Sequence, residues 1–229
     1  MNNTTKAMQS RAFFRLEHIE RALQRFQDGF GELNARLCMQ REPFTSEMRS
    51  NILNAYAYLN HLLGKDIDLF TPAGLHCMLE LNHIVLCGTK PSVRFEYHNH
   101  ILSTRARYQE NIRPIRNWVL RRTGWADPYR LATGFYVRGL SQPQLFIEGN
   151  QRTGNIIINY ILLGKAQPPF IITPEKAKPY LDWSGQIKMS QRSAFRGNRL
   201  STIAVRRQLQ EFLRRNVQAT YLQPDEARP

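Results

Sequence analysis

The sequence contains little cysteine. Its three cysteines, Cys38, Cys77 and Cys87, are too few for a disulfide framework and too isolated for a zinc site. Free cysteine is commonly a buried core residue, and unpaired thiols fit a reducing compartment. We therefore expect a cytoplasmic protein, and export into another cell remains open as an alternative.

Long apolar runs are also missing. No uninterrupted apolar stretch reaches the roughly 18 residues that a membrane-spanning helix needs, and residues 1–9 lack the apolar segment of a secretory signal. We therefore expect neither a transmembrane segment nor a signal peptide. The 229 residues, 42% of them hydrophobic, are enough for one domain with a single core and a helical appendage. No internal repeat is visible.

Acidic residues are scarce relative to basic ones. The chain has 32 Lys and Arg against 18 Asp and Glu, which gives a net charge of +14 and a pI near 10.2. This balance favours an acidic partner: nucleic acid, an anionic membrane surface or an acidic protein. No nucleic-acid-binding motif is present, so the arginines form either solvated helix faces or a partner surface. They gather in two clusters: Arg105, Arg107, Arg113, Arg116, Arg121 and Arg122, and Arg192, Arg196, Arg199, Arg206, Arg207, Arg214 and Arg215.

Apolar residues recur at three and four positions along most of the chain, which predicts an all-α fold. Capping residues support three of the helix starts, because an N-cap is expected at Thr45 or Ser46, at Thr71 and at Asp127. The run 151–163 is apolar nearly all round and predicts a buried central helix. The other predicted helices cover residues 8–38, 45–64, 72–88, 105–122, 128–140, 174–187 and 200–216.

Residues 92–103 show a different period. Here apolar and polar residues alternate, which predicts a short strand pair or hairpin. The alternating residues are Val93, Arg94, Phe95, Glu96, Tyr97 and His98.

One segment combines an acid, a glycine turn and a basic residue immediately before the central helix. A helix that begins near Gln151 leaves its first N–H groups unpaired, and these groups attract an anion. Gly149 and Asn150 tolerate the backbone angles of such a turn. Glu148 could hold Mg²⁺, and Arg152 could grip phosphate. The alternative is an ordinary turn before a core helix.

This segment resembles the signature of the Fic (Fido-domain) family, which reads H-x-F-x-D/E-G-N-G-R-x-x-R. Phe146, Glu148, Gly149, Asn150 and Arg152 stand at matching positions. The resemblance implies a Fic-type helical bundle around the central helix, with a β-hairpin flap. It implies an N-terminal helical extension at 1–44, a Fic-like domain at 45–190, and a C-terminal helix with a disordered tail at 191–229.

The resemblance also implies an activity. The best-known members transfer AMP from ATP, with Mg²⁺, to a hydroxyl side chain of a target protein, which docks on the flap by strand addition. It assigns Gln144 and Glu148 to catalytic positions and Glu148 to the metal. The nucleotide-binding positions are Gly149, Asn150, Gln151, Arg152 and Asn155, and the flap positions are Arg94, Phe95, Glu96, Tyr97 and His98.

Three residues depart from the family signature. Gln144 replaces the histidine that takes the proton, and a neutral amide cannot act as a general base. Gln151 replaces a glycine of the phosphate turn, and Asn155 replaces the arginine that grips the terminal phosphates of ATP. His98 or His100 would be a candidate for a relocated base.

Three functions are therefore open. The chain could be a transferase of AMP with weakened or altered activity. It could use a diphosphate-linked nucleotide instead, as does the phosphocholine-transferring branch of the family, for which the missing arginine would matter less. It could also be an inactive module that binds a nucleotide or phosphate and uses its basic surface to bind a partner.

Overall fold

The computed structural model describes residues 12–124, 127–195 and 200–223, and these residues fold into helices. No strand occurs in the described ranges, where two isolated bridges, Phe14 to Leu222 and Gln142 to Gln191, are the β-type contacts. The all-α prediction is confirmed. The α-helices are α1 (Leu16–Asp28), α2 (Phe30–Ala35), α3 (Ser46–Gly64), α4 (Pro72–Cys87), α5 (Pro91–Glu96), α6 (His98–Leu120), α7 (Pro128–Leu140), α8 (Asn150–Leu163), α9 (Pro174–Met189) and α10 (Leu200–Asn216).

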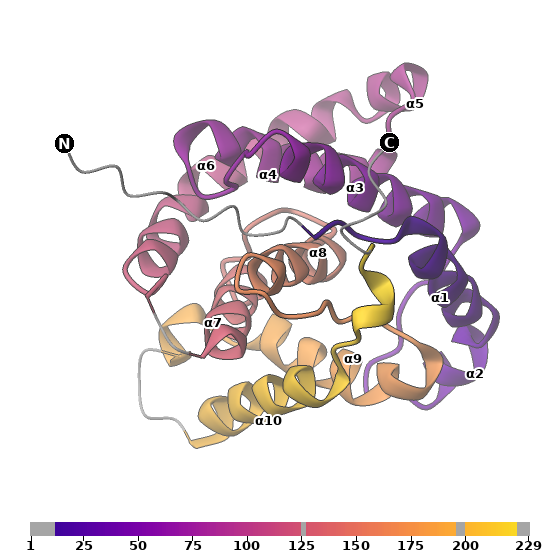
Figure 1. Ribbon diagram of the computed structural model, residues 1–229, viewed down its shortest axis with the longest axis vertical. Coiled ribbons are helices and arrows are strands. Elements are labelled where there is room, and N and C mark those ends of the chain that lie inside the picture. The colour runs from indigo at the N-terminus through magenta and orange to yellow at the C-terminus, as the bar shows by residue number, and fades with distance from the viewer. Residues whose placement is uncertain (1–11, 125–126, 196–199, 224–229) are drawn as a thin grey trace.

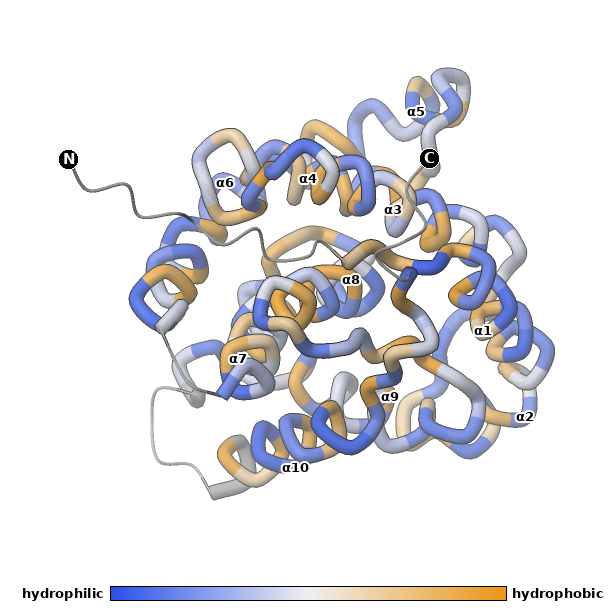
Figure 2. Tube along the Cα trace, in the orientation of Figure 1, coloured by the Kyte–Doolittle hydropathy of each residue, from blue (hydrophilic) through white to orange (hydrophobic). Residues whose placement is uncertain are grey.

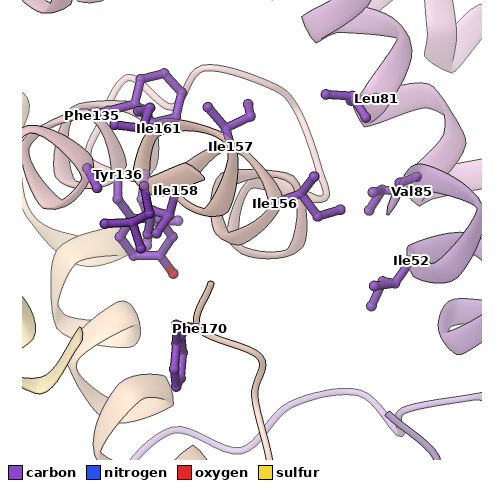
Figure 3. Close-up of a cluster of buried hydrophobic side chains, with 14 of the residues drawn as sticks. Ile52, Leu81, Val85, Phe135, Tyr136, Ile156, Ile157, Ile158, Ile161 and Phe170 are labelled. Atoms are coloured by element: carbon purple, nitrogen blue, oxygen red, sulfur yellow. The ribbon is translucent and has the colours of Figure 1, made fainter. Parts of the chain in front are cut away.

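Helix α8 lies in the middle of the bundle, as its all-round apolar sequence predicts (Figure 1). Ile156 points toward Ile52 of α3 and Val85 of α4 (Figure 3). On the opposite side of α8, Ile158 and Ile161 are buried near aromatic residues of α7. Burying a side chain of this size stabilises the fold by about 1.5–3 kcal/mol. The central helix is therefore fixed on all sides, and its first turn is held in place.

The outer helices α1 and α10 each bury one face. In Figure 2, α1 and α10 mix hydrophilic and hydrophobic residues along their length, as helices with one solvent-exposed face do. The capping predictions are confirmed: Met48 N donates to Thr45 Oγ1, Gly74 N to Thr71 Oγ1, and Tyr129 N to Asp127 Oδ1. No helix in the described ranges is both long and apolar enough to cross a membrane.

The long helix predicted at 8–38 is two helices in the structure. Helix α1 ends at Asp28 and α2 begins at Phe30, with Gly29 between them. Residues 8–11 lie outside the described part of the chain. Phe14, which precedes α1, is fully buried, and its main-chain N–H donates to Asn60 Oδ1 of α3 at 2.8 Å. The apolar side chains of α1 and α2 belong to the same core as those of the other helices.

The predicted hairpin at 92–103 is wrong. These residues form α5 and the start of α6, with i to i−4 bonds from Arg94 N to Lys90 O and from Tyr97 N to Val93 O. Pro91 stands in the first turn of α5, where its missing N–H costs nothing. The alternation also marks no buried face, because Phe95 is 83% exposed. Figure 1 shows α5 at the edge of the bundle, and this segment offers no strand edge for docking a target.

The C-terminal segment continues from α10 through a short 3₁₀ turn at Ala219–Tyr221. Arg15 N donates to Tyr221 O, and Gln223 N donates to Phe13 O, so this segment lies against the start of the described chain. The disordered tail predicted beyond Gln223 lies outside the described residues, as do Arg196 and Arg199 of the second basic cluster.

Candidate functional site

The turn before α8 has the backbone geometry that the sequence predicts. Gly149 is the N-cap, with φ +70° and ψ 5°, and α8 begins at Asn150, one residue earlier than predicted. A Cβ atom on Gly149 would lie 2.9 Å from Asn82 Nδ2 of α4. Asn82 Nδ2 donates to Glu148 O and to Thr153 Oγ1, both at 3.0 Å. Glycine is therefore required here both for the left-handed backbone and for the close approach of Asn82.

Asn150 holds the loop that precedes it. Its Oδ1 accepts from Phe146 N at 2.8 Å, and its Nδ2 donates to Phe146 O at 2.9 Å. The side chain is buried, so both main-chain groups of Phe146 obtain partners away from water. The side chain of Asn150 therefore organises the loop, while its main-chain N–H remains in the unpaired first turn of α8.

Gln144, at the position of the family's histidine, is 8% exposed. Its Nε2 donates to Leu140 O at 3.0 Å, and its Oε1 accepts from Asn150 Nδ2 at 3.3 Å. Both ends of the amide are thus used to fix the loop. A neutral amide cannot act as a general base. His98 and His100 stand at the start of α6, and neither lines the cavity described below.

The two carboxylates nearest the turn are exposed. The carboxylate of Glu148 forms no hydrogen bond or ion pair with a described residue, and Glu42 also lies at the surface. Burial lowers the pKa of Arg152, and the charges of Glu148 and Glu42 act in the opposite direction. Arg152 Nη1 donates to Val85 O at 3.4 Å. No group of three His, Cys, Asp or Glu among the described residues is placed to hold a metal ion. A metal here would need ligands from a bound phosphate, as Mg²⁺ sites often have.

The side-chain oxygens of Gln151 and Asn155 accept hydrogen bonds from residues outside α8. Arg41, in the connection between α2 and α3, donates from Nη1 to Gln151 Oε1 at 2.5 Å. The hydroxyl of Tyr56, in α3, donates to Asn155 Oδ1 at 3.5 Å. Gln151 Nε2 is buried without a hydrogen-bond partner. The first turn of α8 therefore meets a cation that the sequence analysis did not associate with it.

A cavity of about 510 Å³ opens at this end of α8. Pockets of this volume accommodate small molecules and cofactors. Its lining contains every residue of the predicted catalytic and nucleotide-binding set: Gln144, Glu148, Gly149, Asn150, Gln151, Arg152 and Asn155. Arg41 and Glu42 also line it. Its apolar wall includes Leu23, Phe26, Phe30, Phe44, Ile52, Ile156 and Ile171. The structure thus brings the predicted site residues together around one cavity.

The predicted flap residues lie elsewhere. Arg94 is paired with Glu80 of α4 at 2.6 Å, and it also donates to Gly88 O at 2.9 Å. Phe95 and Tyr97 are exposed, and none of the five predicted flap residues lines the cavity. The role assigned to them as a docking hairpin is therefore wrong.

Sequence reasoning missed three residues of the site: Arg41, Tyr56 and Asn82. Each is separated from the signature by more than 60 positions, and each stands in a segment without a recognisable motif. Asn82 left a signal, because it stands at helical spacing from the apolar residues Met78, Leu81 and Val85 of α4. A buried amide normally has a hydrogen-bonding task.

Comparison of the chain with protein-family models, with curated proteins and with solved structures gives no match. The functional argument therefore depends on the residues of the cavity and on their chemistry.

Proposed function

We propose that this protein binds a phosphorylated nucleotide in the cavity at the start of α8, in the manner of Fic proteins, and that its transfer of AMP is weak, altered or lost. One observation carries the proposal. Seven residues at positions of the Fic signature line one cavity of about 510 Å³ at a helix N-terminus: Gln144, Glu148, Gly149, Asn150, Gln151, Arg152 and Asn155.

The binding chemistry follows from the walls of the cavity. The unpaired N–H groups of the first turn of α8 would donate to phosphate oxygens. Arg152 would add a cation, and the exposed Glu148 would hold Mg²⁺ against the same phosphate. The apolar and aromatic residues of α1 and α2 would pack against the nucleoside.

The transfer chemistry is impaired at one step. Transfer of AMP needs the target hydroxyl to lose its proton as its oxygen attacks the α-phosphate and pyrophosphate leaves. Gln144 cannot accept this proton, and loss of a general base costs about 10²–10⁴-fold in rate. Positioning by the metal and by α8 would leave residual catalysis. A diphosphate-linked donor such as CDP-choline is the alternative substrate class, because it has no terminal phosphate for Asn155 to hold.

A second candidate function is a regulatory module that binds a nucleotide but transfers nothing. The observation in its favour is that Gln144 is bonded at both polar ends, to Leu140 at the end of α7 and to Asn150 at the start of α8, so its amide is engaged in holding the loop. The exposed side chains of Arg105, Arg113 and Arg121 on α6 would supply its partner surface. An acidic protein is the proposed partner, and nucleic acid is the alternative.

The two functions differ in a label-transfer experiment. The protein is incubated with Mg²⁺ and labelled ATP, CDP-choline or UDP-glucose in a lysate, next to Glu148→Ala and the surface control Glu20→Ala. Labelled protein bands that disappear in Glu148→Ala and persist in Glu20→Ala would support transfer. Nucleotide binding by calorimetry with no labelled band would support the module. Absence of both binding and label would contradict the proposed function.

A further inference from the structure

Arg41 enters the cavity from outside the signature. It lies in the connection between α2 and α3, and Asn34 fixes its main chain on both sides. Asn34 Nδ2 donates to Arg41 O at 2.9 Å, and Arg41 N donates to Asn34 Oδ1 at 2.8 Å. The position of Arg41 is therefore set by its own segment and does not depend on a ligand.

The guanidinium of Arg41 has only neutral partners. Nη1 donates to Gln151 Oε1 at 2.5 Å and Nη2 to Leu181 O at 2.7 Å. The Nε atom is buried and has no hydrogen-bond partner, and Arg41 forms no ion pair with a described carboxylate. This differs from Arg94, whose guanidinium is paired with Glu80 at 2.6 Å.

A partly buried cation that forms no close ion pair is costly. Removing a charge from water is compensated only when an opposite charge and hydrogen bonds replace the lost hydration. Burial lowers the pKa of Arg41, and the charge of Asp182 acts in the opposite direction; the guanidinium remains charged. The two hydrogen bonds of Arg41 offset part of this cost, and its Nε remains available to a ligand.

A bound anion would provide the missing charge. Arg41 contacts Gln151 in the first turn of α8, next to Arg152, and all three residues line the cavity. Two guanidinium groups and the N-terminus of a helix suit an anion with several charges better than a single carboxylate. We propose that Arg41 is a phosphate-binding residue of this cavity, and that it supplies a cation for the diphosphate of a nucleotide. This inference rests on the proposed function.

Binding would require one exchange. Gln151 Oε1 now occupies Nη1 of Arg41, and a phosphate oxygen would replace this neutral acceptor with a charged one. The exchange would place a negative charge against the guanidinium of Arg41. It would not move the main chain of Arg41, which Asn34 holds.

The test measures dissociation constants of Mg-ADP, Mg-pyrophosphate and adenosine by calorimetry. Arg41→Gln is compared with Arg36→Gln, a control on an exposed arginine five residues away in the same connection. Because hydrogen bonds to charged groups are strong, Arg41→Gln should raise the dissociation constants of Mg-ADP and Mg-pyrophosphate by about 10–100-fold. Adenosine affinity and the control should be unchanged.

The ratio of the dissociation constants of ADP and adenosine distinguishes phosphate binding from a structural role of Arg41. If Arg41 has a structural role, Arg41→Gln would weaken the binding of ADP and of adenosine by the same factor, and that result would overturn the inference. Equal ADP affinity in Arg41→Gln and the native protein would overturn it while leaving the proposed function intact. A native protein that binds neither ADP nor pyrophosphate would overturn both. Where Arg41→Gln fails to fold by circular dichroism, Arg41→Met is measured instead, because it keeps the apolar stem and removes the charge.

Discussion

The side chain of Asn150 bonds both main-chain groups of Phe146: it accepts from the N–H at 2.8 Å and donates to the carbonyl at 2.9 Å. A residue in the first turn of α8 thus determines the path of the loop that precedes the helix. Since Gln144 also accepts from Asn150, the loop and the helix form one unit around the cavity.

Asn150→Ala should destabilise the protein. The substitution leaves two buried main-chain groups of Phe146 without partners, at a cost of about 1–3 kcal/mol in the free energy of unfolding. Urea unfolding followed by circular dichroism measures the change. Asn99→Ala, at an exposed position of α6, is the control and should change stability by less than about 0.5 kcal/mol. Equal stability of the two variants would contradict the role given to Asn150.

Gly149→Ala should destabilise the turn and weaken ligand binding together. The residue has φ +70°, and the added Cβ would lie 2.9 Å from Asn82 Nδ2. A non-glycine residue in this backbone region costs about 1–2 kcal/mol, and the Asn82 contact adds to that cost.

Gly31→Ala is the matched control for Gly149→Ala. Gly31 lies inside α2, and its Cβ would meet nothing within 4 Å. Replacing a glycine in a helix stabilises it by about 0.5–1 kcal/mol. Opposite signs for the two alanine variants in thermal unfolding are expected. A stabilised Gly149→Ala protein would show that the turn is less constrained than its geometry indicates.

Glu148→Gln should remove the Mg²⁺ dependence of nucleotide binding. The carboxylate is exposed and forms no bond with a described residue, so the free energy of unfolding should change by less than about 0.5 kcal/mol. Calorimetric titration with ADP, with and without Mg²⁺, measures the effect, and Glu20→Gln is the control. If Mg²⁺ still strengthens ADP binding in Glu148→Gln, the metal is held elsewhere.

Gln144→His should raise the rate of AMP transfer. A histidine at this position would line the cavity and restore a proton acceptor, for which the expected gain is about 10²–10⁴-fold. Because a neutral imidazole is the base, the rate should increase as pH rises through about 6.5. The assay follows labelled AMP on protein bands between pH 5.5 and 8.

Gln109→His, on the exposed face of α6, is the control for Gln144→His and should leave the rate unchanged. If neither single variant transfers AMP, the triple variant Gln144→His, Gln151→Gly and Asn155→Arg is the next comparison. Transfer that first occurs in the triple variant would indicate that the native chain is an inactive relative. A folded triple variant that binds ADP but transfers nothing would contradict the resemblance as a guide to chemistry.

The helical part of the fold could be predicted because local signals agreed with the tertiary structure. Thr45, Thr71 and Asp127 cap helices where the sequence indicates starts, and the all-round apolar run after Arg152 is buried. In these segments propensity, capping and burial all favour the same structure.

The hairpin prediction failed because an alternation of six residues is too short to distinguish a strand from a helix. Pro91 gave the competing signal, since proline in the first helical turn also marks the starts of α4, α7 and α9. The alternation would have needed one buried face, whereas Phe95 lies in solvent.

The site could be predicted only where its residues are contiguous. The segment from Gln144 to Asn155 carries the turn and most of the polar wall of the cavity. Arg41 is 110 positions from its partner Gln151, and no local pattern links the two residues. Packing of α2 and α3 against α8 and α9 brings them together, and that packing is visible only in the folded chain.

The most direct measurement is a crystal structure of the protein grown with Mg²⁺ and ADP. The account predicts phosphate oxygens about 2.7–3.2 Å from the first N–H groups of α8, with Arg152 and Arg41 donating to them. Mg²⁺ should bridge the phosphate and Glu148. A cavity that stays empty at saturating Mg-ADP, or a nucleotide bound with its phosphates directed to solvent, would contradict the account.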